Sequence, residues 1–196
     1  MPRLSIDHIS SPLARAFSIS RGAKTSAETI RVALEAGGHV GRGECVPYSR
    51  YGETVDSVRQ AIEAMRTDIE NGLDRAGLQD ALPAGAARCA LDCAFWDLEA
   101  KTTGTPVWKL AGLPEPKPLE TAVTIVLDEV DAMAEAARTA PSSLLKLKLG
   151  GANDMDRVRA VHEARPDARL TLDGNEALDA AVFPEIVRAA AHLGVV

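Results

Sequence analysis

The chain has 196 residues, a formal net charge of −6 and a hydrophobic share of 46%, which is the balance of an ordinary globular protein. The acidic total argues against a protein that binds nucleic acid or anionic membranes, because such proteins need a basic surface. The sequence has neither an apolar run of the ~20 residues that span a bilayer nor a signal-peptide pattern at its start. Its three cysteines are too few for a disulfide framework. We therefore expect a soluble cytoplasmic protein.

The chain begins with the pattern of a small antiparallel sheet. Residues 3–9 have the pattern of a short strand, and residues 28–36 alternate apolar and polar side chains. Gly37-Gly38 is a two-residue hairpin signal, after which residues 39–45 can return as the paired strand.

Two helices are predicted to follow the sheet. Apolar residues recur at steps of three and four over about residues 55–69 and again over about 84–102. Cys89 and Cys93 are four residues apart in the second of these helices and fall on its apolar side. We interpret them as buried small hydrophobic residues rather than metal ligands.

The second half of the chain has a different pattern. Residues 112–118 hold three prolines in seven positions and predict a linker. Beyond it, strand and helix patterns alternate three times, which indicates a parallel sheet with right-handed crossovers. The predicted pairs are 119–127 with 129–139, 144–149 with 154–164, and 169–172 with 183–193.

The last residues, 194–196, have the pattern of the beginning of a fourth strand. Three βα units leave a parallel sheet with an open edge, and a closed (β/α)₈ barrel takes about 250 residues. We therefore expect the sequence to be a fragment of a longer chain, or another chain to supply the rest of the barrel.

Lys146 and Lys148 are the first candidate site residues. Residues two apart in a strand point to the same face, so both ammonium groups lie on one side of the strand. Two neighbouring ammonium groups weaken each other's hold on a proton, which suits a lysine that acts as a base. The alternative is a solvated amphipathic edge strand, in which lysines are common.

Asp173 is the second candidate, in the segment Asp173-Gly-Asn-Glu176 at the end of the following strand. A carboxylate at that end of a barrel strand can bind a hard cation such as Mg²⁺. The alternative is an ordinary turn, which these residue types favour. Taken together, paired lysines beside a divalent metal suit the removal of a proton α to a carboxylate.

Six segments, in this order along the chain, resemble the enolase superfamily, in its muconate-lactonizing subgroup with a Lys-x-Lys strand. Within that subgroup the chain is most similar to the dipeptide epimerases that act on L-Ala-D/L-Glu. The segments are Phe17–Gly22, Gly43–Tyr48 with Arg50–Glu53, Leu82–Arg88, Ala90–Leu98, Lys146–Lys148 and Leu172–Glu176.

The resemblance implies an α+β capping domain over residues 1–115, followed by the first part of a (β/α)₈ TIM-type barrel. Residues 119–196 would form the first three βα units of that barrel. The capping-domain loops near residues 17–24 and 46–53 would close over the barrel mouth and select the substrate.

The resemblance also implies roles for individual residues. Lys148 would be the acid/base at the substrate α-carbon, and Lys146 would lower the pKa of Lys148 and contact the substrate carboxylate. Asp173 would be the first Mg²⁺ ligand. Arg21 is expected to pair with a substrate side-chain carboxylate, and Thr124 to contact the substrate.

The implied activity is a Mg²⁺-dependent epimerisation of a dipeptide through an enediolate, in the metabolism of cell-wall peptides. The small-molecule dipeptide is the expected partner, and a homo-oligomer is left open. The family also needs two further carboxylate ligands and an opposite-face lysine, which would lie beyond Val196. Alternatives are another Lys-x-Lys enzyme (a cycloisomerase, a succinylbenzoate synthase or an N-acylamino acid racemase) or a truncated, non-catalytic chain.

Overall fold

The structure, a computed structural model, describes residues 1–19, 22–150, 153–193 and 195–196. The chain divides into two compact units, each with its own hydrophobic core. The first unit contains residues 1–12 and 26–117, and the second contains residues 13–25 and 118–196. Among the described helices, none combines the length and the hydropathy that crossing a bilayer requires.

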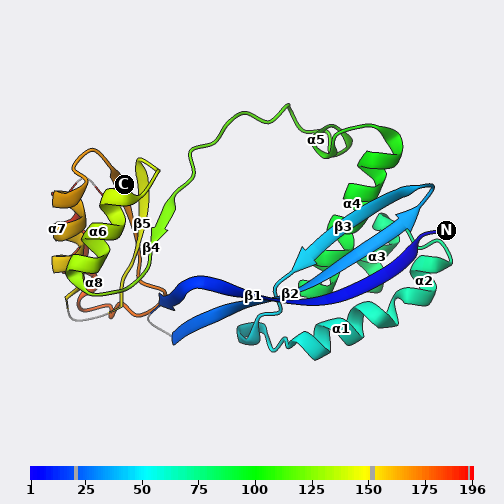
Figure 1. The fold of residues 1–196 in the computed structure, drawn as a ribbon, viewed down its shortest axis with the longest axis horizontal. Coiled ribbons are helices and arrows are strands. Elements are labelled where there is room, and N and C mark those ends of the chain that lie inside the picture. The colour runs from blue at the N-terminus through cyan, green and yellow to red at the C-terminus, as the bar shows by residue number, and fades with distance from the viewer. Residues whose placement is uncertain (20–21, 151–152, 194) are drawn as a thin grey trace. The chain divides into compact units, whose positions relative to one another are not determined.

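The first three strands form one sheet in the order β1-β2-β3 (Figure 1). They are β1 (Arg3–Ile19), β2 (Gly22–Ala36) and β3 (His39–Cys45), so the first two are longer than predicted. β2 and β3 pair antiparallel, as expected from the hairpin signal. The turn places Gly37 at φ 58° and Gly38 at φ 77°, a left-handed pair that favours glycine at both positions.

The helices of the first unit differ in part from the prediction. The helix expected over 55–69 is two helices, because the backbone at Met65 turns to ψ −7°. Thr54 and Ser57 form a capping box that starts the first of them. The structure adds two short helices that the sequence pattern did not predict. The helices are α1 (Val55–Ala64), α2 (Arg66–Glu70), α3 (Arg75–Ala81), α4 (Ala86–Thr103) and α5 (Val107–Leu110).

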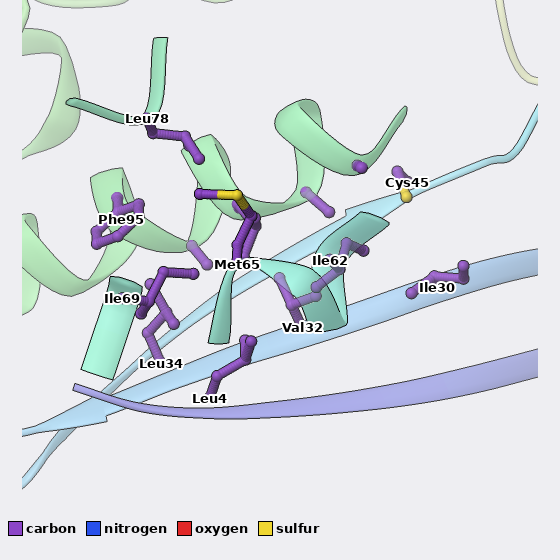
Figure 2. Packing of buried hydrophobic residues seen from close by; sticks show 14 of the residues in the cluster. Leu4, Ile30, Val32, Leu34, Cys45, Ile62, Met65, Ile69, Leu78 and Phe95 are labelled. Atoms are coloured by element: carbon purple, nitrogen blue, oxygen red, sulfur yellow. The ribbon is translucent and has the colours of Figure 1, made fainter. Parts of the chain in front are cut away.

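The core of the first unit lies between the sheet and the helices, as Figure 2 shows. The apolar positions of β2 predicted to share one face, Ile30, Val32 and Leu34, are fully buried. They pack with residues from β1 and from α1 to α4. The labelled side chains are Leu4, Ile30, Val32, Leu34, Cys45, Ile62, Met65, Ile69, Leu78 and Phe95.

The interpretation of Cys89 and Cys93 as buried residues is wrong, since both are exposed. The two thiols lie outside the buried face of α4. The apolar spacing in the sequence marks this packed face correctly, and only the placing of the two cysteines on it is wrong. The buried residues after Ala86 are Ala87, Ala90, Leu91, Ala94, Phe95 and Leu98.

The second unit has the predicted alternation of strands and helices (Figure 1). Its strands are parallel in the order β4-β5-β6. The first strand is shorter than the predicted 119–127, and Val195 pairs in parallel with Leu170, where the beginning of a fourth strand was expected. The elements are β4 (Val123–Ile125), α6 (Val130–Thr139), β5 (Leu144–Lys148), α7 (Asp154–Ala164), β6 (Arg169–Asp173) and α8 (Phe183–Ala191).

The core of the second unit joins one face of the sheet to the three helices. Leu145, Leu147 and Leu149 are fully buried, and they pack in one cluster with Met133 of α6 and Val158 of α7. Because strand side chains alternate, the residues between these leucines lie on the other face. The strands therefore have one leucine-rich face under the helices and one face that carries polar groups.

α4 packs on β3 so closely that β3 needs glycine at two positions. A Cβ atom added at Gly41 would overlap the carbonyl oxygen of Ala94, and one added at Gly43 would overlap that of Ala90. Neither clash is with a flexible side chain, so the strand and the helix would have to move apart. This contact fixes α4 against the sheet of the first unit.

We expect Gly43→Ala to reduce the free energy of unfolding of the first unit by about 3 kcal/mol, because overpacking against backbone displaces the helix. Urea titration followed by circular dichroism measures the change. Arg42→Ala, at an exposed position of the same strand, is the control, with an expected change within ~0.5 kcal/mol. Equal stability of the two variants would contradict the close packing.

Candidate active site

The register of the second sheet places the candidate residues on a single face. Thr124 of β4 is directly opposite Lys146 of β5, which in turn is opposite Thr171 of β6. Lys148 is opposite Asp173 in the same register. Because paired residues of parallel strands point to the same side and i, i+2 residues share a face, all five lie on the face away from the leucines.

Both lysine ammonium groups contact the same carboxylate oxygen. Lys146 Nζ lies 2.9 Å and Lys148 Nζ 2.7 Å from Asp173 Oδ2. The other oxygen, Oδ1, accepts the backbone N–H of Asn175 at 2.9 Å. The Lys148 side chain is only 9% exposed, whereas 39% of the Lys146 side chain is exposed. The site therefore combines one buried and one accessible cation with a single anion, and this pairing offsets the cost of burying Lys148.

The charges around Asp173 keep its carboxylate ionised. The hydrogen bond from Lys146, followed by that from Lys148, holds the pKa of Asp173 well below its usual range. The Asn175 N–H acts in the same direction, while partial burial opposes it. The arrangement thus offers an anionic oxygen donor next to two cations, one of which is accessible to a bound carboxylate.

A buried aspartate supports the backbone that follows Lys148. Asp154, the first residue of α7, is 5% exposed and accepts the Gly150 N–H with its Oδ1 at 3.1 Å and its Oδ2 at 3.0 Å. Arg157 donates to the same carboxylate at 3.3 Å. The sequence analysis did not single out Asp154. Its one signal is an acidic residue in the first turn of a predicted helix.

The turn after β6 positions Asp173 through its backbone. Asn175 and Glu176 have positive φ angles of 46° and 67°, a region that non-glycine residues enter at some cost. The Asn175 N–H bond to the Asp173 side chain is the type of turn that aspartate favours. The two interpretations of Asp173-Gly-Asn-Glu176, turn and site, are therefore compatible, and the role of the Asn175 backbone was missed.

The remaining predicted residues have different outcomes. Thr124 lies beside Lys146 on the shared face, and its contact with a substrate stays a prediction. Arg21 lies outside the described residues. Over the part of the chain that the structure describes, no three His, Cys, Asp or Glu side chains gather as a metal-binding group. The carboxylate of Asp173 has the oxygen donors that Mg²⁺ prefers, so it suits one ligand position.

Comparison with known proteins gives a matching family and a similar relative. Residues 4–112 match the mandelate racemase / muconate lactonizing enzyme family over its N-terminal domain. The chain is 42% identical over 187 residues to the L-Ala-D/L-Glu epimerase of Escherichia coli K12, an alignment that covers 94% of this chain and 58% of that protein. The chain therefore spans about three fifths of the length of this relative.

Two solved structures extend the likeness to the whole described fold. A crystal structure of an enolase family member from Agrobacterium tumefaciens, described as bound to sodium and L-Ala-L-Glu, has a TM-score of 0.93 and 41% identity. It covers 100% of this chain and 60% of the other. The dipeptide epimerase of Enterococcus faecalis, complexed with Mg and L-Leu-L-Tyr, has a TM-score of 0.88 and 28% identity, covering 98% and 58%. The fold is an α+β capping domain followed by the first part of a (β/α)₈ barrel, as predicted.

We expect Asp173→Asn to lower the free energy of unfolding of the second unit by about 2 kcal/mol at neutral pH, because the charge-assisted hydrogen bonds of both lysines are lost. The folded pKa of Asp173 is depressed, so its contribution is present above the unfolded pKa of about 4 and is lost as the pH falls below that value.

Urea titrations of both proteins between pH 3 and 7, in the presence of a chelator, measure this pH dependence. The difference between the wild type and the variant should be constant above about pH 5 and shrink towards pH 3. Asp131→Asn, at an exposed position of α6, is the matched control. A difference that does not change with pH would contradict the ion pairing.

Proposed function

Because the chain belongs to the mandelate racemase / muconate lactonizing enzyme family of the enolase superfamily, we propose that its protein is a dipeptide epimerase. The proposed reaction removes and returns the α-proton of a dipeptide of the L-Ala-D/L-Glu type. The observation that carries the proposal is the contact of Lys146 and Lys148 with one oxygen of Asp173 on one face of a parallel sheet. The names of the relatives from E. coli and E. faecalis support the same chemistry.

The proposed roles follow from the burial of the two lysines. Lys148 is enclosed, and we assign to it the exchange of the proton at the substrate α-carbon, where exclusion of water favours proton transfer. Lys146 is more exposed, and we assign to it the substrate carboxylate. Removal of the α-proton leaves negative charge on the carboxylate oxygens, and the Lys146 ammonium would stabilise that charge.

Asp173 is the proposed Mg²⁺ ligand of this chain. Its carboxylate lies at the C-terminal end of β6 and is ionised throughout the range in which enzymes work. When bound, Mg²⁺ would supply positive charge beside the oxygens on which negative charge develops. The Asn175 N–H would keep Asp173 Oδ1 oriented, while both lysines balance the charge of the carboxylate.

Substrate selection is proposed to involve the capping-domain loops. The described residues on both sides of Arg21, 13–19 and 22–25, group with residues 118–196 in one compact unit, which supports a role for residues 17–24 in substrate selection. Arg21 remains the proposed partner of a substrate side-chain carboxylate, and Thr124 a proposed substrate contact. The limits 1–115 for the capping domain and 119–196 for the barrel segment are part of the same proposal.

The physiological setting follows from the substrate class. A dipeptide of L-Ala and Glu points to a role in cell-wall peptide metabolism, in the cytoplasm, with the dipeptide as the small-molecule partner. An assay with L-Ala-L-Glu tests the substrate class directly, and N-acetylglutamate and a muconate in parallel test the alternative racemase and cycloisomerase activities.

The test uses residues 1–196 fused to the remainder of the E. coli relative, which completes the barrel. The fusion is incubated with L-Ala-L-Glu and Mg²⁺ in D₂O, and proton NMR follows the α-proton of the Glu residue. Loss of this signal together with the appearance of the D-Glu diastereomer is the expected result. Exchange of N-acetylglutamate alone would replace the proposal with a racemase of acylated amino acids.

We expect Lys148→Ala in this fusion to abolish epimerisation and to lower the rate of deuterium exchange by about 10³-fold on the substrate face that Lys148 serves, because it removes the proposed acid/base group. The matched control is Lys109→Ala, at an exposed position of α5, which should leave the rate unchanged. Circular dichroism shows whether both variants are folded. Retained epimerisation in a folded Lys148→Ala protein would remove Lys148 from the proposed role.

We expect removal of Mg²⁺ by a chelator to abolish exchange in the fusion, and addition of excess Mg²⁺ to restore it, because the charge on the carboxylate oxygens then lacks its main stabilisation. In the Asp173→Asn variant the Mg²⁺ concentration needed for half-maximal rate should rise at least about tenfold, because an amide oxygen carries no full charge. Full activity in the chelator would exclude a metal-dependent reaction.

A further inference from the structure

A glutamate ties a surface loop of the first unit to the beginning of its longest helix. Glu53 Oε1 accepts the backbone N–H of Ala86, the first residue of α4, at 2.7 Å, across 33 residues of sequence. Glu53 Oε2 accepts the backbone N–H of Tyr48 at 3.1 Å. One carboxylate thus holds both the loop of residues 46–53 and the helix.

The loop itself is a compact turn. The Tyr51 N–H donates to the Tyr48 carbonyl at 2.9 Å, and the Gly52 N–H donates to the Ser49 carbonyl at 3.0 Å. Gly52 is in the left-handed region with φ 75°, which favours glycine there. The rings of Tyr48 and Tyr51 meet edge to face, with 5.6 Å between their centroids. Glu53 ends this turn, so its anchor fixes the whole loop.

The contact with α4 requires a carboxylate at position 53 and glycine at position 85. α4 has 18 residues, and the positive end of its dipole favours an anion at Ala86. A Cβ atom added at Gly85 would lie 2.9 Å from Glu53 Oε1, so a side chain at this position would displace the carboxylate. Gly85 itself has an extended backbone with φ 162°, and alanine can adopt that conformation without strain.

The anchored loop presents apolar groups on the surface. Val46 is 55% and Tyr51 76% exposed. They line a groove of about 720 Å³ together with Cys45, Tyr48 and Cys89. Apolar side chains grouped in this way on a surface are typical of a binding surface, and a rigid surface of this kind binds at a lower entropic cost than a mobile one.

We propose that Glu53 is a positioning residue, which holds the loop of residues 46–53 on the N-terminus of α4 in a single conformation so that Val46 and Tyr51 are presented for substrate selection. The consequence for the substrate rests on the proposed function. The anchoring does not, because it is a property of residues 46–53, Gly85 and Ala86 alone.

Native-state proteolysis of the chain of 196 residues tests the anchoring. Trypsin can cleave the Arg50–Tyr51 bond only when the loop opens. Cleavage at this bond should accelerate roughly tenfold or more in Glu53→Ala and in Gly85→Ala, because the charge-assisted hydrogen bonds are lost. Glu53→Gln keeps one acceptor oxygen and should lie between these variants and the wild type. Glu35→Ala, an exposed carboxylate of β2, should cleave as the wild type.

Two results would overturn the proposal. The first is an unchanged rate at Arg50–Tyr51 in Glu53→Ala and Gly85→Ala. The second is a rate that rises equally after Arg59 and Arg75 of the same unit, because this would show a general loss of stability rather than a freed loop. A rise confined to Arg50–Tyr51 supports the anchoring whether or not the chain contributes to an epimerase.

The consequence for the substrate is tested in the fusion enzyme. Glu53→Gln should raise KM for L-Ala-L-Glu several-fold, roughly 3- to 10-fold, with kcat within about twofold of the parent, because the loop contributes to binding rather than to the chemical step. A fall in kcat at constant KM would refute the proposed role of the loop. An inactive parent fusion would overturn the proposed function and the substrate consequence, and would leave the proteolysis result intact.

Discussion

A single oxygen atom, Oδ2 of Asp173, holds two lysine ammonium groups together, and the candidate site of the second unit depends on this contact. The contact requires the observed register of β5 and β6, in which Lys148 is directly opposite Asp173 and Leu147 is opposite Leu172. A slip of one residue would turn the polar groups of one strand to the other face of the sheet. Leu147 is fully buried in the core, so the packing that stabilises the sheet also fixes the register that brings the three charges together.

The features that could be predicted from the sequence are those in which apolar side chains recur at a regular spacing of a few residues. Ile30, Val32 and Leu34 are buried on one face of β2. In the second sheet, Leu147 and Leu149 are buried on the face that the lysines of β5 do not share. Both patterns arise because strand side chains alternate regardless of their surroundings. Helix α3 was missed because Leu78 is its one buried residue, and a single apolar position has no periodicity. The break at Met65 was missed for a related reason: Met65 and Ile69 are both buried, so the apolar spacing continues across a change in the backbone.

The site could be predicted as a set of side chains and not as a set of backbone contacts. The order of strands along the chain, together with the end at which each motif lies, is enough to expect Lys146, Lys148 and Asp173 close together. The supports, in contrast, are N–H groups of Gly150 and Asn175 that bind carboxylates. Almost any residue type can provide a backbone N–H group. Whether that group binds a carboxylate depends on the folded backbone conformation, which the residue type does not reveal. The same holds for Ala86, whose N–H binds Glu53 from 33 residues away.

The positions of the two lysines can account for exchange of the substrate α-proton with solvent, but not for inversion of the α-carbon. Lys146 and Lys148 come from one strand and reach the same oxygen, so a substrate placed against them meets both on one side. A base on one side can remove an α-proton and return it to that side, which exchanges hydrogen with solvent and retains the configuration. Inversion needs a second proton donor on the other side of the planar intermediate. That donor cannot be either of these lysines, and the proposed epimerase therefore depends on a group contributed from outside the β5–β6 pair.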